Sequence, residues 1–189
     1  LVEGVDIIPV SSLVELCHLL NKPESLNPLG PTNIENQVRN KDAVDFTDIY
    51  GQEHAKRALE IAVAGHHNIL LNGPPGAGKT MMARAILSIM PAPSKEEVIA
   101  ITKLHSLAGE LTAEVRTTRP LRSPHHTSSS IALIGGGRNP KPGEISLSHK
   151  GVLFLDELPE YSRSCLESLR QPLEDRHVTI ARAQDTVTF

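Results

Sequence analysis

The chain has 189 residues and a formal net charge of −3, with hydrophobic residues at 39% and aromatic residues at 3%. This length and balance predict a globular protein with a mainly aliphatic core, large enough for one core with or without an appendage. They disfavour a membrane-spanning protein, because no apolar run approaches 18 residues, and they disfavour a generally basic protein that coats nucleic acid.

The first 45 residues predict a short ordered segment followed by a linker. Residues 5–10 are typical of a short strand, and Ser12 followed by Glu15 forms a capping-box pattern for a helix to about Leu20. Residues 21–45 contain three prolines and several asparagines without apolar periodicity, which predicts a linker. The chain begins with Leu and shows no signal peptide, so we expect a cytoplasmic piece of a longer protein.

The two cysteines, Cys17 and Cys165, have no partner at metal-ligand spacing and form no disulfide framework. Both are typical of small buried hydrophobic residues in a reducing compartment. This pattern agrees with the cytoplasmic location.

Three helices and one strand are predicted in the next 60 residues. Apolar residues at helical spacing before Gly65 indicate a helix that stops at this glycine. Residues 69–71 indicate a buried strand, and Lys79–Met90 indicate a helix that ends before a proline. A second capping box opens a helix over about Ser94–Leu107.

The remaining residues continue this alternation. The glycines of "SIALIGGG" indicate a tight bend or hairpin, and residues 151–157, "GVLFLDE", predict a strand buried on both faces. A helix over 163–174 and a hairpin over 177–189, with its turn near 183–185, complete the chain. Strands that alternate with helices predict an α/β sandwich around a parallel sheet.

A glycine-rich loop stands between the strand at 69–71 and the helix that follows. It matches the pattern G-x-x-x-x-G-K-[ST] in full, and its glycines allow backbone N–H groups to point at phosphate oxygens. The lysine of this pattern reaches the β- and γ-phosphates, and the hydroxyl of the last residue is placed to bind Mg²⁺. The spacing predicts a site for ATP with Mg²⁺, formed by Gly73, Pro74, Pro75, Gly76, Ala77, Gly78, Lys79, Thr80 and Met81.

Two acids end the strand at 151–157. Alone, an acid pair at a strand end is often a solvated corner or a helix cap, but phosphoryl transfer needs a carboxylate for the Mg²⁺ shell and a group that orients water. Asp156 suits the first role, together with Thr80, and Glu157 the second. We therefore predict ATP hydrolysis, with Glu157 and Lys79 as catalytic residues.

Positive charge gathers in residues 116–150. Six cations and one acid give this segment a charge of +5, which leaves −8 for the rest of the chain. Such a segment is either a solvated face or a sequence-independent contact with a phosphate backbone. The residues considered for nucleic-acid binding are Arg138, Lys141, His125 and His126. The adjacent histidines also raise metal binding, which the absence of a companion ligand at suitable spacing disfavours.

The segments "YGQEHAKRAL", "LLNGPPGAGKT" and "GVLFLDELPE" together resemble an AAA+ ATPase, and residues 121–182 closely resemble the magnesium-chelatase-like competence family, ComM/YifB. The resemblance implies a three-layer α/β/α P-loop sandwich, a hexameric ring, and adenine contacts from Tyr50, Gly51 and Gln52. It implies the end of a Lon-like domain at 1–20, a linker at 21–45, and an AAA+ module at 46–189 with a basic helix-2 insert at 115–150. The function it implies is branch migration of DNA during natural transformation.

The sequence departs from the complete family pattern because it stops at Phe189. The resemblance places sensor 1, the arginine finger and sensor 2 beyond that residue, and it places the sensor-1 strand between the strands at 69–71 and 151–157. We therefore expect an incomplete sandwich that is weakly stable and turns over ATP poorly by itself.

Two other functions share the nucleotide site. One is the ATPase subunit of a magnesium chelatase, which remodels a protein partner during Mg²⁺ insertion into a porphyrin. The other is a nucleotide-binding switch or scaffold with little turnover, which Glu157 disfavours.

Overall fold

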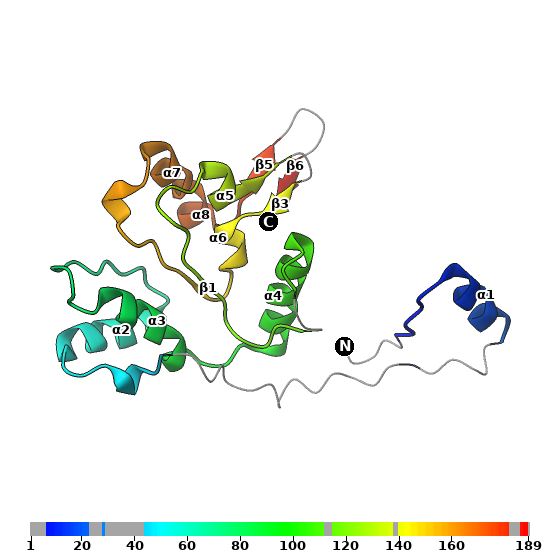
Figure 1. The fold of residues 1–189 in the computed structure, drawn as a ribbon, viewed down its shortest axis with the longest axis horizontal. Coiled ribbons are helices and arrows are strands. Elements are labelled where there is room, and N and C mark those ends of the chain that lie inside the picture. The colour runs from blue at the N-terminus through cyan, green and yellow to red at the C-terminus, as the bar shows by residue number, and fades with distance from the viewer. Residues whose placement is uncertain are drawn as a thin grey trace. The chain divides into compact units, whose positions relative to one another are not determined.

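Figure 1 presents the chain as a computed structural model, which describes residues 7–22, 28, 44–111, 115–137, 140–181 and 186–188. The chain divides into two units, Leu1–Gln37 and Val38–Phe189.

The N-terminal unit contains the predicted helix as α1 (Leu13–Asn21). The Ser12 side chain accepts a hydrogen bond from the Glu15 N–H, as predicted, but the Glu15 carboxylate accepts from the N–H and hydroxyl of Ser11. Residues 7–10 form no strand, and the rest of the predicted strand and most of the linker lie outside the described residues.

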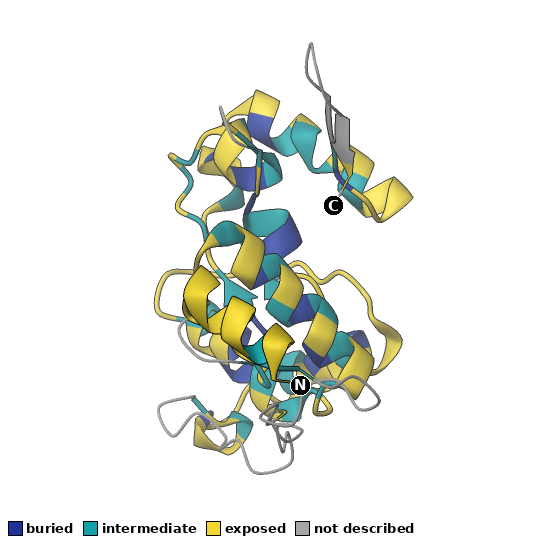
Figure 2. Cartoon of the chain, turned by 90° about the vertical axis from the view of Figure 1, so that its right-hand side faces the viewer, coloured by how far each residue is buried: buried dark blue, intermediate teal, exposed yellow. Residues whose placement is uncertain are grey.

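The second unit begins with a small apolar core between helices. After the one-turn helix η3 (Phe46–Asp48) come α2 (Glu53–Gly65) and α3 (Lys79–Ile89), which pack against each other. Buried residues recur at helical spacing along both helices. Figure 2 colours the buried residues of the chain dark blue. The buried residues of this apolar core are Ile49, Leu59, Met82, Ala85 and Ile86. Both helices confirm the sequence prediction, although the left-handed residue that ends α2 is His66, one position after Gly65.

The capping box at Ser94 and Glu97 is confirmed. It opens α4 (Lys95–Ala108), with hydrogen bonds in both directions between the two residues. The helix ends at Gly109, which adopts the left-handed conformation that glycine tolerates best.

The second unit contains one short parallel pair of strands among its described residues. β1 (Leu121–Arg122) pairs with β4 (Val152–Leu153), so the two strands end at the same edge. The parallel pairing confirms the predicted α/β class. The strand predicted over 151–157 is shorter than expected, and its apolar residues are half-buried, not fully buried.

The prediction of a strand at residues 69–71 is wrong. These residues are in no strand, and the Leu70 side chain is 74% exposed. A cavity of about 750 Å³ lies between the segments 66–72 and 151–159, so no hydrogen-bonded neighbour for 69–71 is found among the described residues. A strand needs such a neighbour to pair its backbone groups. The further strand that the resemblance places between these segments stays a prediction.

Within residues 115–150, for which the resemblance predicts an insert, a short helix is followed by a small hairpin. α5 (Ser130–Ile134) begins at the Ser129 cap and leads into the antiparallel strands β2 (Gly135–Gly136) and β3 (Lys141–Pro142). The predicted hairpin is thus confirmed for the glycines, whereas the apolar residues before them are helical. Gly143 is required by close packing, because a Cβ there would lie 2.4 Å from the Leu133 carbonyl oxygen. α6 (Glu144–Leu147) then leads to β4.

The C-terminal segment contains η4 (Leu158–Glu160), α7 (Arg163–Ser168), α8 (Arg170–Asp175), β5 (Thr179–Ala181) and β6 (Thr186–Thr188). The single helix predicted over 163–174 is two helices. Pro172 explains the break, since its ring conflicts with the carbonyl of Ser168, four residues earlier, where α7 ends. The antiparallel pairing of β5 with β6 confirms the hairpin, and its predicted turn lies outside the described residues.

Candidate nucleotide site and its surroundings

The glycine-rich loop curls around the amino group of its own lysine. Gly76 and Gly78 have φ values of 78° and 82°, a conformation that most other residues avoid. Lys79 Nζ donates to the Gly73 and Pro74 carbonyls, both at 2.8 Å. The loop therefore holds a positive charge at its centre, next to the N-terminus of α3, where anions are favoured.

The structure brings Thr80 and Asp156 together although 76 residues separate them. The Thr80 hydroxyl donates to Asp156 Oδ2 at 3.1 Å. Two hard oxygen donors at one point suit Mg²⁺, which uses few protein ligands and keeps several waters. The described residues hold no cluster of three or more His, Cys, Asp or Glu that could form an all-protein metal cage. The donor set therefore fits Mg²⁺ that is shared with a phosphate ligand.

Glu157 faces a different partner from its neighbour Asp156. It adopts a left-handed backbone conformation, with φ at 52°, and its N–H donates to Asp156 Oδ1 at 3.0 Å. Its carboxylate Oε2 lies 3.1 Å from Nδ1 of His126. The sequence predicted His126 only as a candidate for nucleic-acid or metal binding, so this contact was not predicted. The contact depends on the parallel pairing of β1 with β4, and the sequence predicted no strand at β1.

The residues predicted to contact adenine lie on the turn before α2. Tyr50 is 93% exposed, and Gly51 and Gln52 both have positive φ values. α2 packs on α3, the helix that begins in the phosphate loop. The contact of Tyr50, Gly51 and Gln52 with the adenine of a nucleotide stays a prediction.

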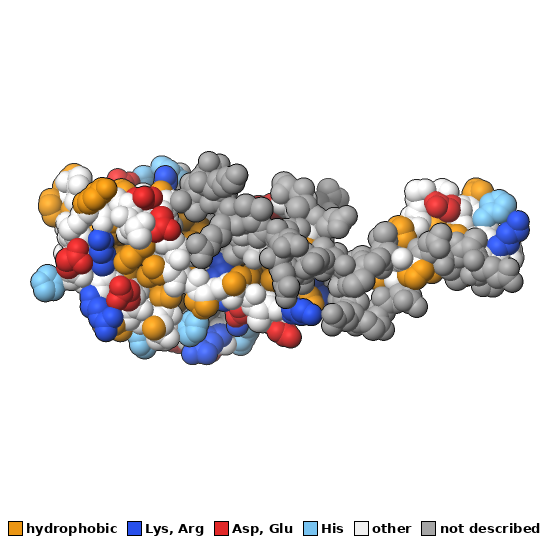
Figure 3. All heavy atoms as spheres, turned by 90° about the horizontal axis from the view of Figure 1, so that it is seen from below, with side chains coloured by type: hydrophobic (Ala, Val, Ile, Leu, Met, Phe, Trp, Pro, Cys, Tyr) orange, Lys and Arg blue, Asp and Glu red, His pale blue; other side chains and the backbone are white. Residues whose placement is uncertain are grey.

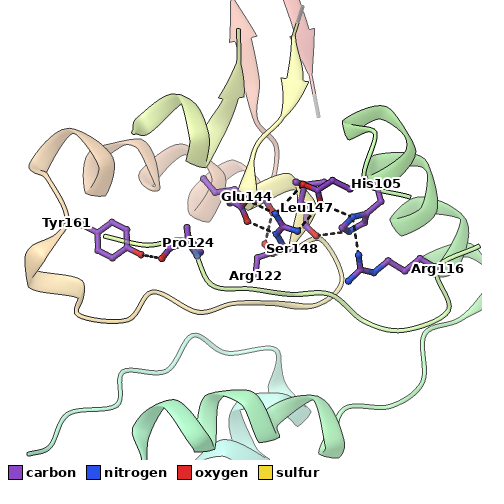
Figure 4. Close-up of polar contacts among 10 residues, drawn as sticks. His105, Arg116, Arg122, Pro124, Glu144, Leu147, Ser148 and Tyr161 are labelled. Atoms are coloured by element: carbon purple, nitrogen blue, oxygen red, sulfur yellow. Dashed lines mark hydrogen bonds and ion pairs between the residues drawn. The ribbon is translucent and has the colours of Figure 1, made fainter. Parts of the chain in front are cut away.

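All the cations of the basic segment that the structure describes contact partners inside the protein; they are Arg116, Arg119, Arg122, Lys141 and Lys150. Arg122 binds Glu144 through two nitrogen atoms (Figure 4). It also donates to Glu110 at 2.9 Å. Arg119 donates to Glu97 at 2.8 Å and to three backbone carbonyls. On the face that Figure 3 draws, Lys and Arg side chains stand among Asp and Glu side chains, not in one continuous area.

Arg116 completes this network at a buried histidine. His105 Nε2 lies 3.1 Å from the Leu147 carbonyl oxygen and therefore donates to it, which leaves Nδ1 to accept from Arg116 Nη1 at 3.2 Å (Figure 4). Burial and the Arg116 charge lower the pKa of His105. The hydrogen bonds of Glu144 raise the pKa of Arg122, against the effect of burial. The network thus requires a neutral His105 and charged arginines.

The other candidates for nucleic-acid contact differ in their surroundings. Arg138 lies outside the described residues, whereas Lys141 is exposed and donates to the Ala108 carbonyl at 3.3 Å. His125 is exposed, stacks on His126 with ring centroids 4.1 Å apart, and contacts the Thr127 hydroxyl at 2.9 Å. Metal binding by the two histidines gains no support from the described residues, among which no group of three or more His, Cys, Asp or Glu is arranged to hold a metal ion.

The phosphate loop, the strand-end acids and the parallel pairing define a P-loop α/β protein of the AAA+ class. Residues 45–189 match the family described as magnesium chelatase, subunit ChlI, and the chain belongs to this family. It is 47% identical over 182 residues to competence protein ComM of Haemophilus influenzae, an alignment that covers 94% of this chain and 36% of that protein.

Two further relatives are similar over most of the chain. Protein YifB of Escherichia coli is 41% identical over 190 residues, covering 100% of this chain and 37% of that protein. Lon protease 2 of Bacillus subtilis is 31% identical over 148 residues, covering 73% of this chain and 26% of that protein. The chain therefore spans about a third of the length of ComM and YifB. These matches confirm the resemblance to ComM and YifB. Within the part of the chain that the structure describes, no helix has the length and apolarity to cross a bilayer.

Proposed function

We propose that this chain is the nucleotide-binding part of an ATPase that hydrolyses ATP with Mg²⁺. The observation that carries the proposal is the contact between Thr80, at the start of α3, and Asp156, after β4, at 3.1 Å. It joins the phosphate loop to the acidic strand end, as hydrolysis of a nucleoside triphosphate requires.

Each residue has a distinct role in this proposal. Lys79 exchanges its two carbonyl partners for phosphate oxygens, and Thr80 and Asp156 hold Mg²⁺, which shields phosphate charge when bound. Glu157 orients and deprotonates the attacking water. Tyr50, Gly51 and Gln52 cover the adenine.

The wider function is proposed from the relatives. We propose a cytoplasmic AAA+ motor that assembles as a homo-oligomeric ring, a hexamer, and moves DNA through its pore by branch migration. The name of the ComM relative, competence protein, supports an action on DNA. The proposed organisation has the end of a Lon-like domain at 1–20, a linker at 21–45 and the AAA+ module from 46, with the basic insert at 115–150 facing the pore.

A second function is favoured by the family description, magnesium chelatase, subunit ChlI. In this alternative the same ATPase site drives the remodelling of a protein partner. The nucleotide site does not distinguish the two functions, so the test must vary the partner.

The experiment measures ATP hydrolysis by the full natural chain with and without single-stranded or branched DNA, at low and high salt. A DNA motor shows stimulation by DNA that fades as salt rises, because phosphate contacts release counterions. Hydrolysis that DNA leaves unchanged contradicts the DNA motor and favours the protein remodeller. A full chain that hydrolyses no ATP with Mg²⁺ contradicts the ATPase proposal itself.

A further inference from the structure

A nearly buried arginine contacts the chain just after α3 and just before β4. The Arg119 side chain is 11% exposed, and each of its three nitrogen atoms donates a hydrogen bond. Nε donates to the Pro91 carbonyl at 2.6 Å, two residues after the last residue of α3. Nη1 donates to the Lys150 carbonyl at 2.7 Å, two residues before the first residue of β4. One side chain thus joins the end of α3 to the start of β4.

An acid at the start of α4 holds the same guanidinium in place. Nη2 of Arg119 donates to Glu97 Oε2 at 2.8 Å, and Lys150 Nζ lies 3.5 Å from Oε1 of that carboxylate. Burial alone would raise the pKa of Glu97, but the Ser94 N–H, Arg119 and Lys150 lower it below its ordinary value. The carboxylate is therefore charged at neutral pH, and Arg119 has a charged partner in addition to the carbonyls of two segments.

The start of β4 also fits closely against the residue after Arg119. The carbonyl of the buried Pro120 accepts a hydrogen bond from the Val152 N–H at 2.9 Å. The same carbonyl oxygen leaves no room for a Cβ at Gly151. A displacement of Arg119 would therefore move the first residues of β4 with it.

The two segments that Arg119 joins carry the proposed Mg²⁺ ligands at their other ends. Thr80 is the second residue of α3, and Asp156 follows β4. α3 has 11 residues, and a helix of that length extends over about 16 Å. Arg119 therefore acts at a distance from the nucleotide site, through the two elements that carry Thr80 and Asp156.

Part of the cavity described above lies between the two connections. It is lined by Ala83, Ile86 and Met90 of α3 and by residues 152–155, although Val152 also packs against the apolar core of α2 and α3. A cavity removes packing contacts that would otherwise fix two elements relative to each other. The polar contacts at the two ends therefore contribute more to the alignment of α3 with β4.

We propose that Arg119 is a positioning residue for the Mg²⁺ site. By fixing the end of α3 against the start of β4, it keeps the Thr80 hydroxyl within reach of the Asp156 carboxylate. This inference rests on the proposed function, in which these two residues hold Mg²⁺. Because Mg²⁺ requires near-ideal octahedral geometry, a small shift between its two protein ligands weakens its binding.

The test compares two conservative variants in the full natural chain. Arg119→Lys keeps a charge beside Glu97 but loses the planar fork that reaches the carbonyls of two segments at once. Arg122→Lys is the matched control, because it weakens a similar network, with Glu144 on α6 and Glu110 at the end of α4.

Two quantities are measured below the melting temperature of each variant. Isothermal titration gives the ATP affinity with Mg²⁺ and with EDTA in its place. Hydrolysis assays give the Mg²⁺ concentration at half-maximal rate. A loss of stability alone changes neither the gain in ATP affinity from Mg²⁺ nor this concentration, so both readouts report on the position of the ligands.

The expected result for Arg119→Lys is a three- to tenfold smaller gain in ATP affinity from Mg²⁺, roughly the scale of one lost hydrogen bond. Half-maximal hydrolysis should need more Mg²⁺ by a similar factor. ATP affinity in EDTA should equal that of the parent, because the phosphate loop is unchanged, and Arg122→Lys should match the parent in both readouts. An unchanged Mg²⁺ dependence in Arg119→Lys overturns the inference, and so does an equal change in Arg122→Lys.

Thr80→Val separates this inference from the proposed function, because it removes the hydroxyl and keeps the shape of the side chain. If Thr80→Val loses the gain in ATP affinity from Mg²⁺ while Arg119→Lys keeps it, only the positioning role is wrong. If Thr80→Val gains affinity from Mg²⁺ as the parent does, the proposed Mg²⁺ site is wrong and the positioning role falls with it.

Discussion

The phosphate loop and the basic insert were both conspicuous in the sequence, yet they differ in how far sequence determines their chemistry. In the loop, the glycines, Lys79 and Thr80 act through backbone geometry and spacing within eight residues. In the insert, charge was predicted by counting cations, but Arg116, Arg119 and Arg122 are engaged by acids, carbonyls and a histidine. The geometry of a local backbone motif can therefore be predicted from a few neighbouring residues. Whether a charged side chain is available to bind a ligand depends on partners far away in the chain.

The largest effect is expected at the phosphate loop. Lys79→Ala removes the charge at the loop centre and should weaken ATP binding at least about tenfold, since hydrogen bonds from a charged donor to phosphate are among the strongest. Isothermal titration with ATP and Mg²⁺ measures this. Lys103→Ala, an exposed lysine on α4, is the control that should bind as the parent does. Equal affinity for the parent and Lys79→Ala would contradict the site.

The next effect tests whether the insert arginines are structural. Arg122 is 21% exposed and binds both Glu144 and Glu110, so Arg122→Ala should lower the free energy of unfolding by about 1–3 kcal/mol. Arg163→Ala removes a pair with Glu167 in which the arginine is 93% exposed and should cost only about 0.3–0.5 kcal/mol. Urea denaturation compares the two. Similar losses would show that the Arg122 network adds nothing beyond surface charge.

A smaller effect concerns the cations that remain candidates for DNA. Arg138→Ala with Lys141→Ala should weaken DNA stimulation of hydrolysis and reduce the salt slope of DNA binding by up to about 1.4–1.8, if each contacts one phosphate. Fluorescence anisotropy at several salt concentrations measures the slope. Arg163→Ala with Arg170→Ala removes two exposed arginines outside the insert and should leave the slope unchanged. An unchanged slope in the insert variant would remove both residues from the DNA contact.

The smallest effect is a pH dependence of stability. The folded state lowers the pKa of His105 from its ordinary value of 6.5, by burial first and then by Arg116. The unfolded chain therefore binds the proton more readily, so stability is full above pH 6.5 and falls as pH drops toward the lowered pKa.

His105→Gln tests this dependence. Glutamine can keep a donor toward the Leu147 carbonyl but does not take up a proton in this range, so the loss of melting temperature below pH 6.5 should become shallower than in the parent. His18→Gln, at an exposed position of α1, serves as the control. If His105→Gln loses melting temperature with falling pH as steeply as the parent does, His105 is not the source of the acid sensitivity.

Much of the fold followed from local patterns in the sequence. The capped helices α1 and α4, the loop-to-helix start at Lys79 and the C-terminal hairpin depend on neighbours within a few residues. The prediction of a strand at 69–71 was wrong because a strand needs a neighbouring strand to pair with, and a cavity lies beside this segment instead. The break between α7 and α8 was in principle readable from Pro172, whose ring acts on the carbonyl four residues earlier.

The candidate site shows the same division. The spacing of the loop and the position of Asp156 after an apolar strand were sufficient to place Thr80 and Asp156 at one site. The partner of Glu157 was not predicted, because His126 comes from another loop, where its ring meets the edge of the Tyr161 ring. No periodicity in the sequence encodes that contact.

The central claim, that this chain hydrolyses ATP at the loop with Glu157 acting on water, is tested most directly by Glu157→Gln. ATP affinity and hydrolysis are measured side by side in the full natural chain. The account predicts affinity within about twofold of the parent and hydrolysis reduced about 100-fold or more, the scale of a lost general base. Hydrolysis at the parent rate in Glu157→Gln would contradict it.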